Sequence, residues 1–204
     1  MNRKICILDY GSGNVLSVQN LVKHLGIEAE ISNSPEQIVN CSHLILPGVG
    51  AFGSSMQKIK DRLPLEILAQ EVLDNNKPFL GICVGMQILA DVGHEFGKHC
   101  GLGWIPGEVK MIESGGLSLP HIGWNDIIEK RESGLLNGLK SIRDFYFVHS
   151  YVYVPLDEDC VVATAEYGTT FPVIIQRGNL YGVQFHPEKS QKAGEQLMLN
   201  FFNL

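Results

Sequence analysis

The stretch Phe79-Leu80-Gly81-Ile82-Cys83-Val84-Gly85-Met86-Gln87 joins a short apolar run directly to a segment with helical character. Residues 79–82 have the continuous apolar character of a strand that is covered on both faces. Residues 83–90 read as a helix. A sharp strand-to-helix turn pushes its central side chain out at the edge of a sheet, and flanking glycines avoid a clash there. The stretch therefore predicts a buried strand that presents the thiol of Cys83. A buried cysteine in an ordinary strand-to-helix turn is the alternative interpretation.

Strand-like and helix-like segments also alternate upstream of this stretch. Three further strands are predicted, at residues 5–8, 27–31 and 43–46. Residues 15–25 have apolar side chains at helical spacing, and residues 52–75 read as helical with an interruption near Pro64. This β-α-β alternation predicts a parallel sheet that is wrapped by helices.

The second half of the chain changes character. Six strand candidates with short turns follow one another, at residues 108–112, 122–128, 144–149, 161–166, 173–177 and 181–185. They predict antiparallel additions to the sheet, and a final helix is expected over residues 190–202. We therefore expect a single α/β domain over residues 1–204. Its architecture is a three-layer sandwich around a central mixed, mostly parallel sheet.

Composition excludes several classes of protein. The chain has 204 residues, of which 45% are hydrophobic and 19% charged, and this is ordinary for one folded domain. With 16 basic and 22 acidic residues the net charge is −6, which argues against nucleic acid as a partner. No apolar run reaches the length of roughly 18 residues that a membrane span needs, so no membrane association is expected.

The five cysteines are odd in number, irregularly spaced and without a CxxC pair. No secretion signal is apparent, so we expect free thiols in a reducing cytosol and a cytoplasmic protein. His94, His99 and Cys100 match no common zinc template. Neither a metal nor a cofactor is expected.

The segment Gln184-Phe185-His186-Pro187-Glu188 supplies a candidate base. Pro187 biases His186 toward an extended backbone, in which side chains two residues apart point the same way. Glu188 can then bond one imidazole nitrogen and leave the other for Cys83. This is the arrangement of nucleophile, base and orienting carboxylate. Taken alone, the segment could also be a His-Pro turn with a solvated carboxylate.

The loop Pro47-Gly48-Val49-Gly50 is a candidate for an oxyanion hole. Such a site needs one backbone N–H from the residue after the nucleophile, here Val84, and a second from a neighbouring loop. The N–H of Val49 is the candidate for the second donor. A simple turn is the alternative interpretation.

These residues resemble the class I, triad-type glutamine amidotransferases, and more narrowly the HisH family of glutaminase subunits of imidazole glycerol phosphate synthase. The resemblance extends over nearly the whole chain. It is carried by the segments 11–14, 47–50, 81–87, 101–103, 122–125, 147–151 and 183–190. It implies a flavodoxin-like glutaminase fold.

The resemblance also implies a reaction and a substrate. Cys83 would attack the side-chain amide of L-glutamine, His186 would carry protons, and water would release glutamate from the thioester. The residues that would hold glutamine are Gly50, Gln87, Glu95, His149, Ser150 and Tyr151. Glu95 suits the α-amino group, because a buried cation needs an anionic partner. His149 could instead be a packed core histidine.

Members of this family pair with a cyclase subunit shaped as a (β/α)8 barrel. The resemblance therefore implies a heterodimer in which ammonia passes to the cyclase, which makes imidazole glycerol phosphate and AICAR in histidine biosynthesis. Asn14, Tyr146 and Lys189 match interface positions. The chain itself shows no phosphate loop, nucleotide fingerprint or second domain that could supply the acceptor chemistry, which favours a subunit over a complete enzyme.

Three alternatives stay open at the level of sequence. A paralogous glutaminase subunit would supply ammonia for surface-sugar biosynthesis. A stand-alone cysteine hydrolase would be active without a partner, and the segment 149–151 argues against it. A redox-sensing cysteine protein would have no use for the pair of His186 and Glu188.

Overall fold

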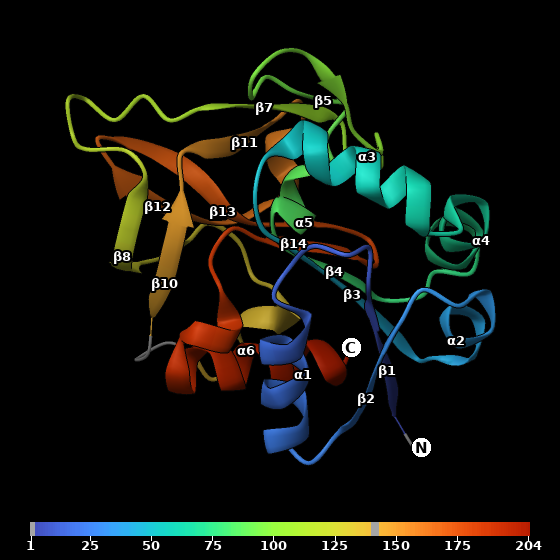
Figure 1. The fold of residues 1–204 in the computed structure, drawn as a ribbon. Helices are drawn as coiled ribbons and strands as arrows, with labels where there is room; N and C mark the ends of the chain where they lie inside the picture. The colour runs from blue at the N-terminus through green and yellow to red at the C-terminus, as the bar shows by residue number, and fades with distance from the viewer. Residues whose placement is uncertain (1–2, 140–142) are drawn as a thin grey trace.

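The computed structural model describes residues 3–139 and 143–204. Its centre is an eight-stranded sheet with the order β2-β1-β3-β4-β14-β13-β12-β9 (Figure 1). The first five strands pair in parallel: β2 (Glu28–Ser32), β1 (Lys4–Leu8), β3 (His43–Gly48), β4 (Phe79–Cys83) and β14 (Leu180–Val183). Antiparallel pairs then add β13 (Thr169–Arg177), β12 (Val161–Tyr167) and β9 (Ile128–Glu129). The predicted mixed, mostly parallel sheet is confirmed. The strand expected at residues 181–185 was predicted as an antiparallel addition, but β14 pairs with β4 in parallel, since the apolar pattern of a strand does not indicate the direction of its partner.

Helices cover both faces of this sheet, so the predicted three layers are confirmed as well. One face carries α1 (Val15–His24) and α6 (Gln191–Phe202), and the other carries α2 (Pro35–Asn40), α3 (Phe52–Arg62) and α4 (Leu65–Ala69) (Figure 1). A π-helical turn (Gln70–Asp74) continues α4. The interruption near Pro64 is where α3 ends, because proline lacks the N–H that a helix interior needs. The short α2 was not predicted, because its six residues are too few to show a helical period.

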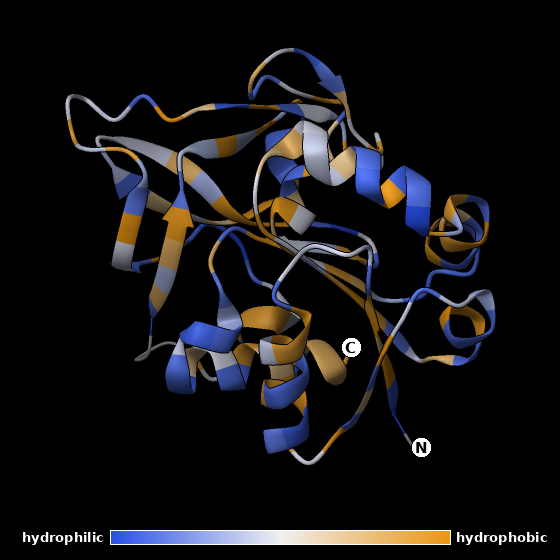
Figure 2. Ribbon diagram, in the orientation of Figure 1, coloured by the Kyte–Doolittle hydropathy of each residue, from blue (hydrophilic) through white to orange (hydrophobic). Residues whose placement is uncertain are grey.

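The core lies where apolar strands meet the apolar faces of the helices. Every residue of β3 and β4 is buried. Figure 2 shows these central strands as apolar, whereas the outward faces of the helices are polar. Phe201 of α6 packs edge-on against His43 of β3, with ring centroids 5.2 Å apart. Burying a phenyl side chain of this kind contributes about 2 kcal/mol, which is why α6 closes over the sheet.

The strands of the second half do not all join the central sheet. β8 (His121–Asp126) and β10 (Asp144–His149) form a two-stranded sheet. β11 (Tyr151–Pro155), β7 (Gly107–Met111), β5 (Val92–Gly93) and β6 (His99–Cys100) form a four-stranded one. Within residues 3–139 and 143–204 there are also three single-turn 3-10 helices, at Gly134–Leu136, Glu158–Cys160 and Pro187–Lys189. Strand periodicity shows which residues extend but not which strands pair, so these separate small sheets were not predicted.

The helix after the turn at Cys83 is shorter than expected. α5 spans only Val84–Gln87. The next carbonyls, of Ile88, Leu89 and Ala90, accept backbone hydrogen bonds from residues 102–105 instead of continuing the helix. Because a carbonyl that is bonded across the chain is no longer free for a helical partner, the local helical pattern ends early.

The order of the parallel strands determines where a ligand can bind. The chain crosses from β1 to β2 in one direction and from β2 to β3 in the other. Loops leaving β1 and β3 therefore separate and open a crevice at the carboxyl ends of the strands. Cys83 ends β4 at this same edge, and Val49 follows β3 there. No helix among the described residues is long and apolar enough to cross a membrane.

Candidate active site

Cys83 occupies the sharp turn that the sequence predicts. It ends β4 and precedes α5 with φ +55° and ψ −113°, a conformation that costs energy in any residue except glycine. A Cβ atom on Gly81 would lie 2.3 Å from the carbonyl oxygen of Gly85, so only glycine fits beside the turn. The fold thus holds a strained backbone in order to present this sulfur at the sheet edge.

His186 and Glu188 form a tight pair just after β14, the strand next to β4. Nδ1 of His186 lies 2.8 Å from Oε1 of Glu188, and the two side chains are 5% and 1% exposed. A carboxylate can only accept, so Nδ1–H donates and Nε2 is left for another partner. His186 is extended, as Pro187 predicts. Glu188, however, lies in a 3-10 turn rather than in a continued extended chain, and this turn brings its carboxylate back to the imidazole.

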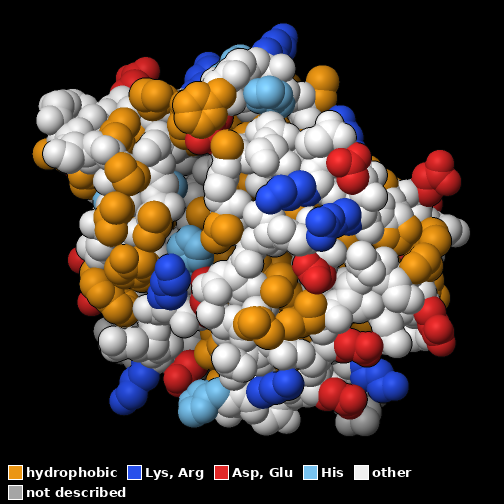
Figure 3. Space-filling view, in the orientation of Figure 1, with side chains coloured by type: hydrophobic (Ala, Val, Ile, Leu, Met, Phe, Trp, Pro, Cys, Tyr) orange, Lys and Arg blue, Asp and Glu red, His pale blue; other side chains and the backbone are white. Residues whose placement is uncertain are grey.

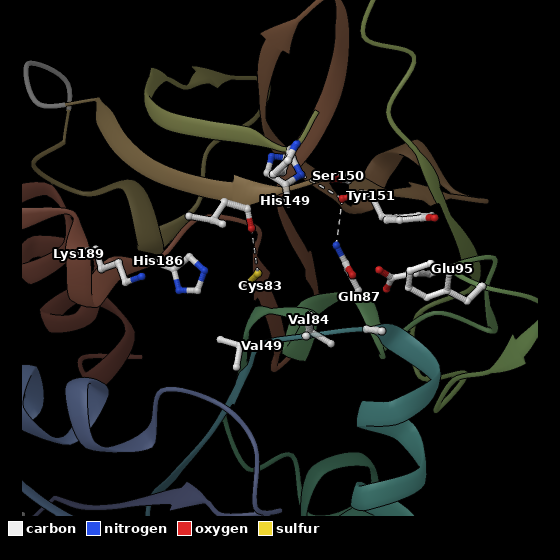
Figure 4. A pocket seen from close by; sticks show the side chains of 15 residues that line it. Val49, Cys83, Val84, Gln87, Glu95, His149, Ser150, Tyr151, His186 and Lys189 are labelled. Atoms are coloured by element: carbon white, nitrogen blue, oxygen red, sulfur yellow. Dashed lines mark hydrogen bonds between the residues drawn. The ribbon is translucent and has the colours of Figure 1, made fainter. Parts of the chain in front are cut away.

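The surroundings of His186 favour the protonated form of its imidazole. Burial alone lowers the pKa of His186, but hydrogen bonds to Cys83 and Glu188, together with their negative charges, outweigh it and raise the pKa to about 10. Cys83 and His186 line the same cavity (Figure 4). The imidazole of His186 therefore favours its protonated form near neutral pH.

The cavity around Cys83 collects most of the predicted site residues. It has a volume of about 380 Å³. Its walls include Val49, Gly50, Cys83, Val84, Gln87, Glu95, His149, Ser150, Tyr151, His186 and Lys189. Of the predicted residues, only Asn14, Tyr146 and Glu188 do not line it. The carboxylate of Glu95 and the ammonium group of Lys189 lie at opposite ends of this cavity (Figure 4).

The two candidate oxyanion donors lie beside Cys83. Gly48 of β3 pairs with Cys83 of β4, so Val49 follows directly next to the turn (Figure 4). Val84 is the first residue of α5. The carbonyl of Val49 accepts a 3.3 Å hydrogen bond from the Ser12 hydroxyl, and Val49 is 39% exposed. The proximity supports the oxyanion interpretation of both residues, whose role stays a prediction.

Gln87 and Glu95, two polar residues of the cavity wall, are held by hydrogen bonds to the backbone. Oε2 of Glu95 accepts a 2.8 Å hydrogen bond from the N–H of Phe52, the first residue of α3. Nε2 of Gln87 donates to the carbonyl of Tyr151 and to Oε1 of Gln184, each at 3.0 Å. Both amide hydrogens of Gln87 are therefore used within the protein. Only its carbonyl oxygen is left to accept a hydrogen bond from a ligand.

His149 lies in the wall and is packed at the same time. Its Nδ1 lies 3.0 Å from the carbonyl of Tyr151, and its Nε2 lies 3.1 Å from Nδ1 of His121. Burial lowers the pKa of His149 to about 3, and the nearby His121 and His186 act in the same direction. His149 is therefore neutral near pH 7. It shapes the cavity without adding a positive charge, and its contact with substrate stays a prediction.

Comparison with known sequences identifies the family. Residues 6–204 match the model of the family described as "Glutamine amidotransferase class-I". The chain is 46% identical over 202 residues to a protein of Moorella thermoacetica named imidazole glycerol phosphate synthase subunit HisH, covering 99% of this chain and 95% of that protein. It is 43% identical to HisH 2 of Vibrio vulnificus, covering 98% and 94%. The chain belongs to the class-I glutamine amidotransferase family.

Solved structures of lower identity share the fold of this amidotransferase. PurLQS from Thermotoga maritima superposes with a TM-score of 0.76 at 18% identity, covering 100% of this chain and 99% of that chain. A putative GMP synthase subunit from Thermoplasma acidophilum superposes with a TM-score of 0.73 at 21% identity, covering 100% and 94%. The flavodoxin-like glutaminase fold is confirmed.

The three predicted interface residues lie at or near the mouth of the amidotransferase site. Nζ of Lys189 lies 5.6 Å from the ring centroid of Tyr146. Nδ2 of Asn14 donates to Oε1 of Glu188 at 3.2 Å. Asn14 therefore contacts the carboxylate of the candidate triad, a contact that the sequence did not predict. Its assignment to an interface stays a prediction.

Two residues beside the site were missed by sequence analysis. Gln184 is fully buried and lies 3.7 Å from the Cys83 sulfur through its Nε2. His121 is buried between Phe147 and Tyr167, with ring centroids 5.0 and 4.2 Å away, and it contacts His149. A signal for Gln184 was available, because an amide side chain directly after an apolar strand needs a buried partner. The identity of that partner was not readable from the sequence.

Proposed function

We propose that this chain hydrolyses L-glutamine to glutamate and ammonia through Cys83, His186 and Glu188, and passes the ammonia to a cyclase subunit. Its relatives are glutaminase subunits of the HisH type, so the chain is a glutamine-hydrolysing subunit of imidazole glycerol phosphate synthase in histidine biosynthesis. The observation that carries the proposed mechanism is the buried pair of His186 and Glu188 at the cavity of the strained Cys83. None of the three alternatives from the sequence is favoured by these relatives.

The first half of the reaction forms a thioester. Cys83 gives its proton to Nε2 of His186, and the sulfur attacks the side-chain carbonyl carbon of glutamine. Negative charge then develops on the carbonyl oxygen, where the backbone N–H groups of Val49 and Val84 are the proposed donors. Collapse of the tetrahedral intermediate breaks the C–N bond, and His186 returns the proton to the departing ammonia.

The second half releases glutamate. Water gives a proton to His186 and attacks the thioester carbon, and the same two N–H groups stabilise the oxyanion. The C–S bond breaks, and the proton returns to the sulfur of Cys83. Glu188 keeps the imidazole oriented throughout and stabilises its charged form, as its hydrogen bond to Nδ1 allows.

The walls of the cavity suit glutamine itself. The carboxylate of Glu95 is the proposed partner of the substrate α-ammonium group. Gly50, Ser150 and Tyr151 offer backbone and hydroxyl groups for the remaining polar atoms. A ligand that lacks the α-ammonium group should therefore bind less well.

An apolar patch supports the proposed docking of a cyclase. Ile122 and Trp124 of β8 are 59% and 48% exposed. The Trp124 ring lies 6.0 Å from the Tyr146 ring of β10. Figure 3 shows apolar side chains gathered over β8 and β10, on the same face as the site. Exposed apolar side chains beside an active-site mouth are typical of a surface that another protein covers.

Substitution of the nucleophile tests the mechanism. Cys83→Ala is expected to reduce glutamate release, measured with the cyclase and its nucleotide ligand present, by about 10⁴-fold or more. Cys160→Ala is a control, because this thiol is buried and does not line the cavity. Glutamate release by Cys83→Ala at the parent rate would refute the mechanism. A separate measurement of binding to the cyclase tests the partner, and Trp124→Ala should weaken it by about tenfold or more.

A further inference from the structure

Gln184 is a buried amide that the mechanism above does not use. It follows β14 directly, its backbone N–H donates to the carbonyl of Val173 at 2.9 Å, and its side chain has no exposed surface. Nε2 of Gln184 lies 3.7 Å from Sγ of Cys83. Gln184 therefore touches the atom that reacts, from a position held by the sheet.

The direction of this hydrogen bond follows from a chain of contacts. The carbonyl of Tyr151 can only accept, so the Gln87 group facing it at 3.0 Å must be the NH₂ group. The second hydrogen of that NH₂ group then points to Gln184 at 3.0 Å, which must present its oxygen there. The amide of Gln184 consequently turns its own NH₂ group to the sulfur. A backbone carbonyl thus determines the orientation of both amides.

The sulfur needs such a donor only in its charged form. As a thiol, Cys83 can donate its hydrogen to the carbonyl of Val148, which lies 4.0 Å away. As a thiolate it has no hydrogen to give, and the same carbonyl oxygen repels it. The contacts of Cys83 with Gln184 and with His186 are then the ones that stabilise the negative charge.

We propose that Gln184 donates a hydrogen bond to the Cys83 thiolate and shifts the thiol–thiolate equilibrium toward the nucleophile. This inference rests on the proposed function, in which the thiolate attacks glutamine and leaves again from the thioester. Gln184 acts in both steps, because the sulfur is charged before acylation and after deacylation. Gln87 is the positioning residue for Gln184.

Two substitutions test whether Gln184 acts as a hydrogen-bond donor or only through its packing. Gln184→Met keeps an unbranched side chain of similar size and removes the donor. Gln184→Glu keeps the oxygen that accepts from Gln87, removes the donor and adds a negative charge near the sulfur. Gln176→Glu on β13 is the matched control, because Gln176 bonds Ser133 and Tyr181 and does not line the cavity.

The readout is the rate of Cys83 alkylation by iodoacetamide as a function of pH, followed by mass spectrometry of the Cys83 peptide. All variants carry Cys100→Ser, because Cys100 is the exposed thiol, whereas Cys6, Cys41 and Cys160 are buried. Alkylation reports the thiolate fraction and needs no glutamine, cyclase or turnover. A failure of the glutaminase function therefore cannot be confused with a failure of this inference.

The midpoint of the alkylation profile should rise by about one to two pH units in Gln184→Met, as expected for loss of one hydrogen bond to a charged group. It should rise further in Gln184→Glu and stay at the parent value in Gln176→Glu. The kcat/KM for glutamine near neutral pH should fall about ten- to a hundredfold in Gln184→Met.

A midpoint at the parent value in folded Gln184→Met would overturn the proposal, whether or not glutamate release falls, because that result assigns Gln184 to packing alone. Circular dichroism and urea unfolding establish that each variant is folded. If Gln184→Glu does not fold, Gln184→Met alone decides between the two results.

Discussion

The two sides of the cavity are built in different ways. On the base side, His186 and Glu188 are almost wholly buried and hydrogen-bonded to each other at 2.8 Å. On the oxyanion side, Val49 is 39% exposed, and its carbonyl is held by one 3.3 Å hydrogen bond from Ser12. Buried side chains lock the proton-handling groups, whereas the proposed oxyanion donor belongs to a loop between glycines.

This difference indicates which changes should cost most. A buried pair loses its function when one member is altered, because the other is left without its partner in a place that water does not reach. An exposed loop can move, so a change there costs less stability and acts mainly through the position of the donor N–H.

The base side should be most sensitive to loss of the carboxylate. Glu188→Gln keeps the volume of the side chain but can present an amide NH₂ group to Nδ1. Glutamate release should fall about 10²- to 10⁴-fold, because the imidazole loses its correct tautomer and orientation. The assay is glutamate production with the cyclase present. The exposed Glu132→Gln is the control, and equal activity of the two variants would contradict the triad.

The same pair should produce a measurable pH dependence of stability. The pKa of His186 is raised to about 10 in the folded chain, from an ordinary value of 6.5. The folded chain therefore holds a proton that the unfolded chain releases between these values. The contribution of His186 to the free energy of unfolding is fully present below about pH 6.5 and is lost as the pH rises through about 10. Urea unfolding at a series of pH values measures it, and Glu188→Gln should flatten this slope.

The oxyanion side should respond to crowding of its loop. A Cβ atom on Gly48 would lie 2.5 Å from the N–H nitrogen of Gly85 and 2.8 Å from Cβ of Val84. Gly48→Ala should cost about 1–3 kcal/mol of stability and lower kcat about tenfold or more, because it displaces the turn that carries the nucleophile. Gly26→Ala is the control, since it is strained by φ +75° but contacts no atom within 4 Å. A normal kcat in Gly48→Ala would show that the loop tolerates the shift.

The smallest effect is expected at His149, the neutral histidine of the cavity wall. Burial lowers the pKa of His149 to about 3 from an ordinary value of 6.5. Between these pH values the unfolded chain binds a proton at this histidine and the folded chain does not. Stability should fall as the pH falls between these two values. His149→Asn should reduce this dependence in urea unfolding. His43→Asn should do the same, because burial lowers the pKa of His43 to about 4, yet it should keep glutamate release since His43 does not line the cavity.

The outcome along the chain shows what local patterns can predict. Strands β1 to β4 were predicted as short segments that alternate with helical ones, whereas α2 was too short to show a helical period and β14 was expected to pair in antiparallel. The end of α5 was placed too late, because carbonyls at 88–90 bond to residues 102–105. The small sheets of β8 with β10 and of β7 with β11 were not foreseen either. Pairing between distant strands depends on the whole fold, and the alternation of apolar and polar residues in one strand does not identify its partner.

The candidate site also combines features that the sequence predicted with features that depend on the fold. The sequence predicts the sharp turn from Gly81, Cys83 and Gly85, and it predicts an extended His186 from the adjacent Pro187. Both signals act within one or two residues. The return of Glu188 to His186 through a 3-10 turn, rather than along an extended chain, was decided by the fold. The roles of these residues in catalysis stay predictions that the variants above test.

Residue types and their spacing in the sequence predicted strands β1 to β4, the family and the identities of the candidate nucleophile, base and carboxylate. Those features depend on residue type and on spacing within one element. Only the tertiary structure decided that Asn14 contacts Glu188 and that Gln184 contacts Cys83, 101 positions away. A polar side chain can bond whatever partner lies near it, and the order of strands in the sheet determines which partner that is.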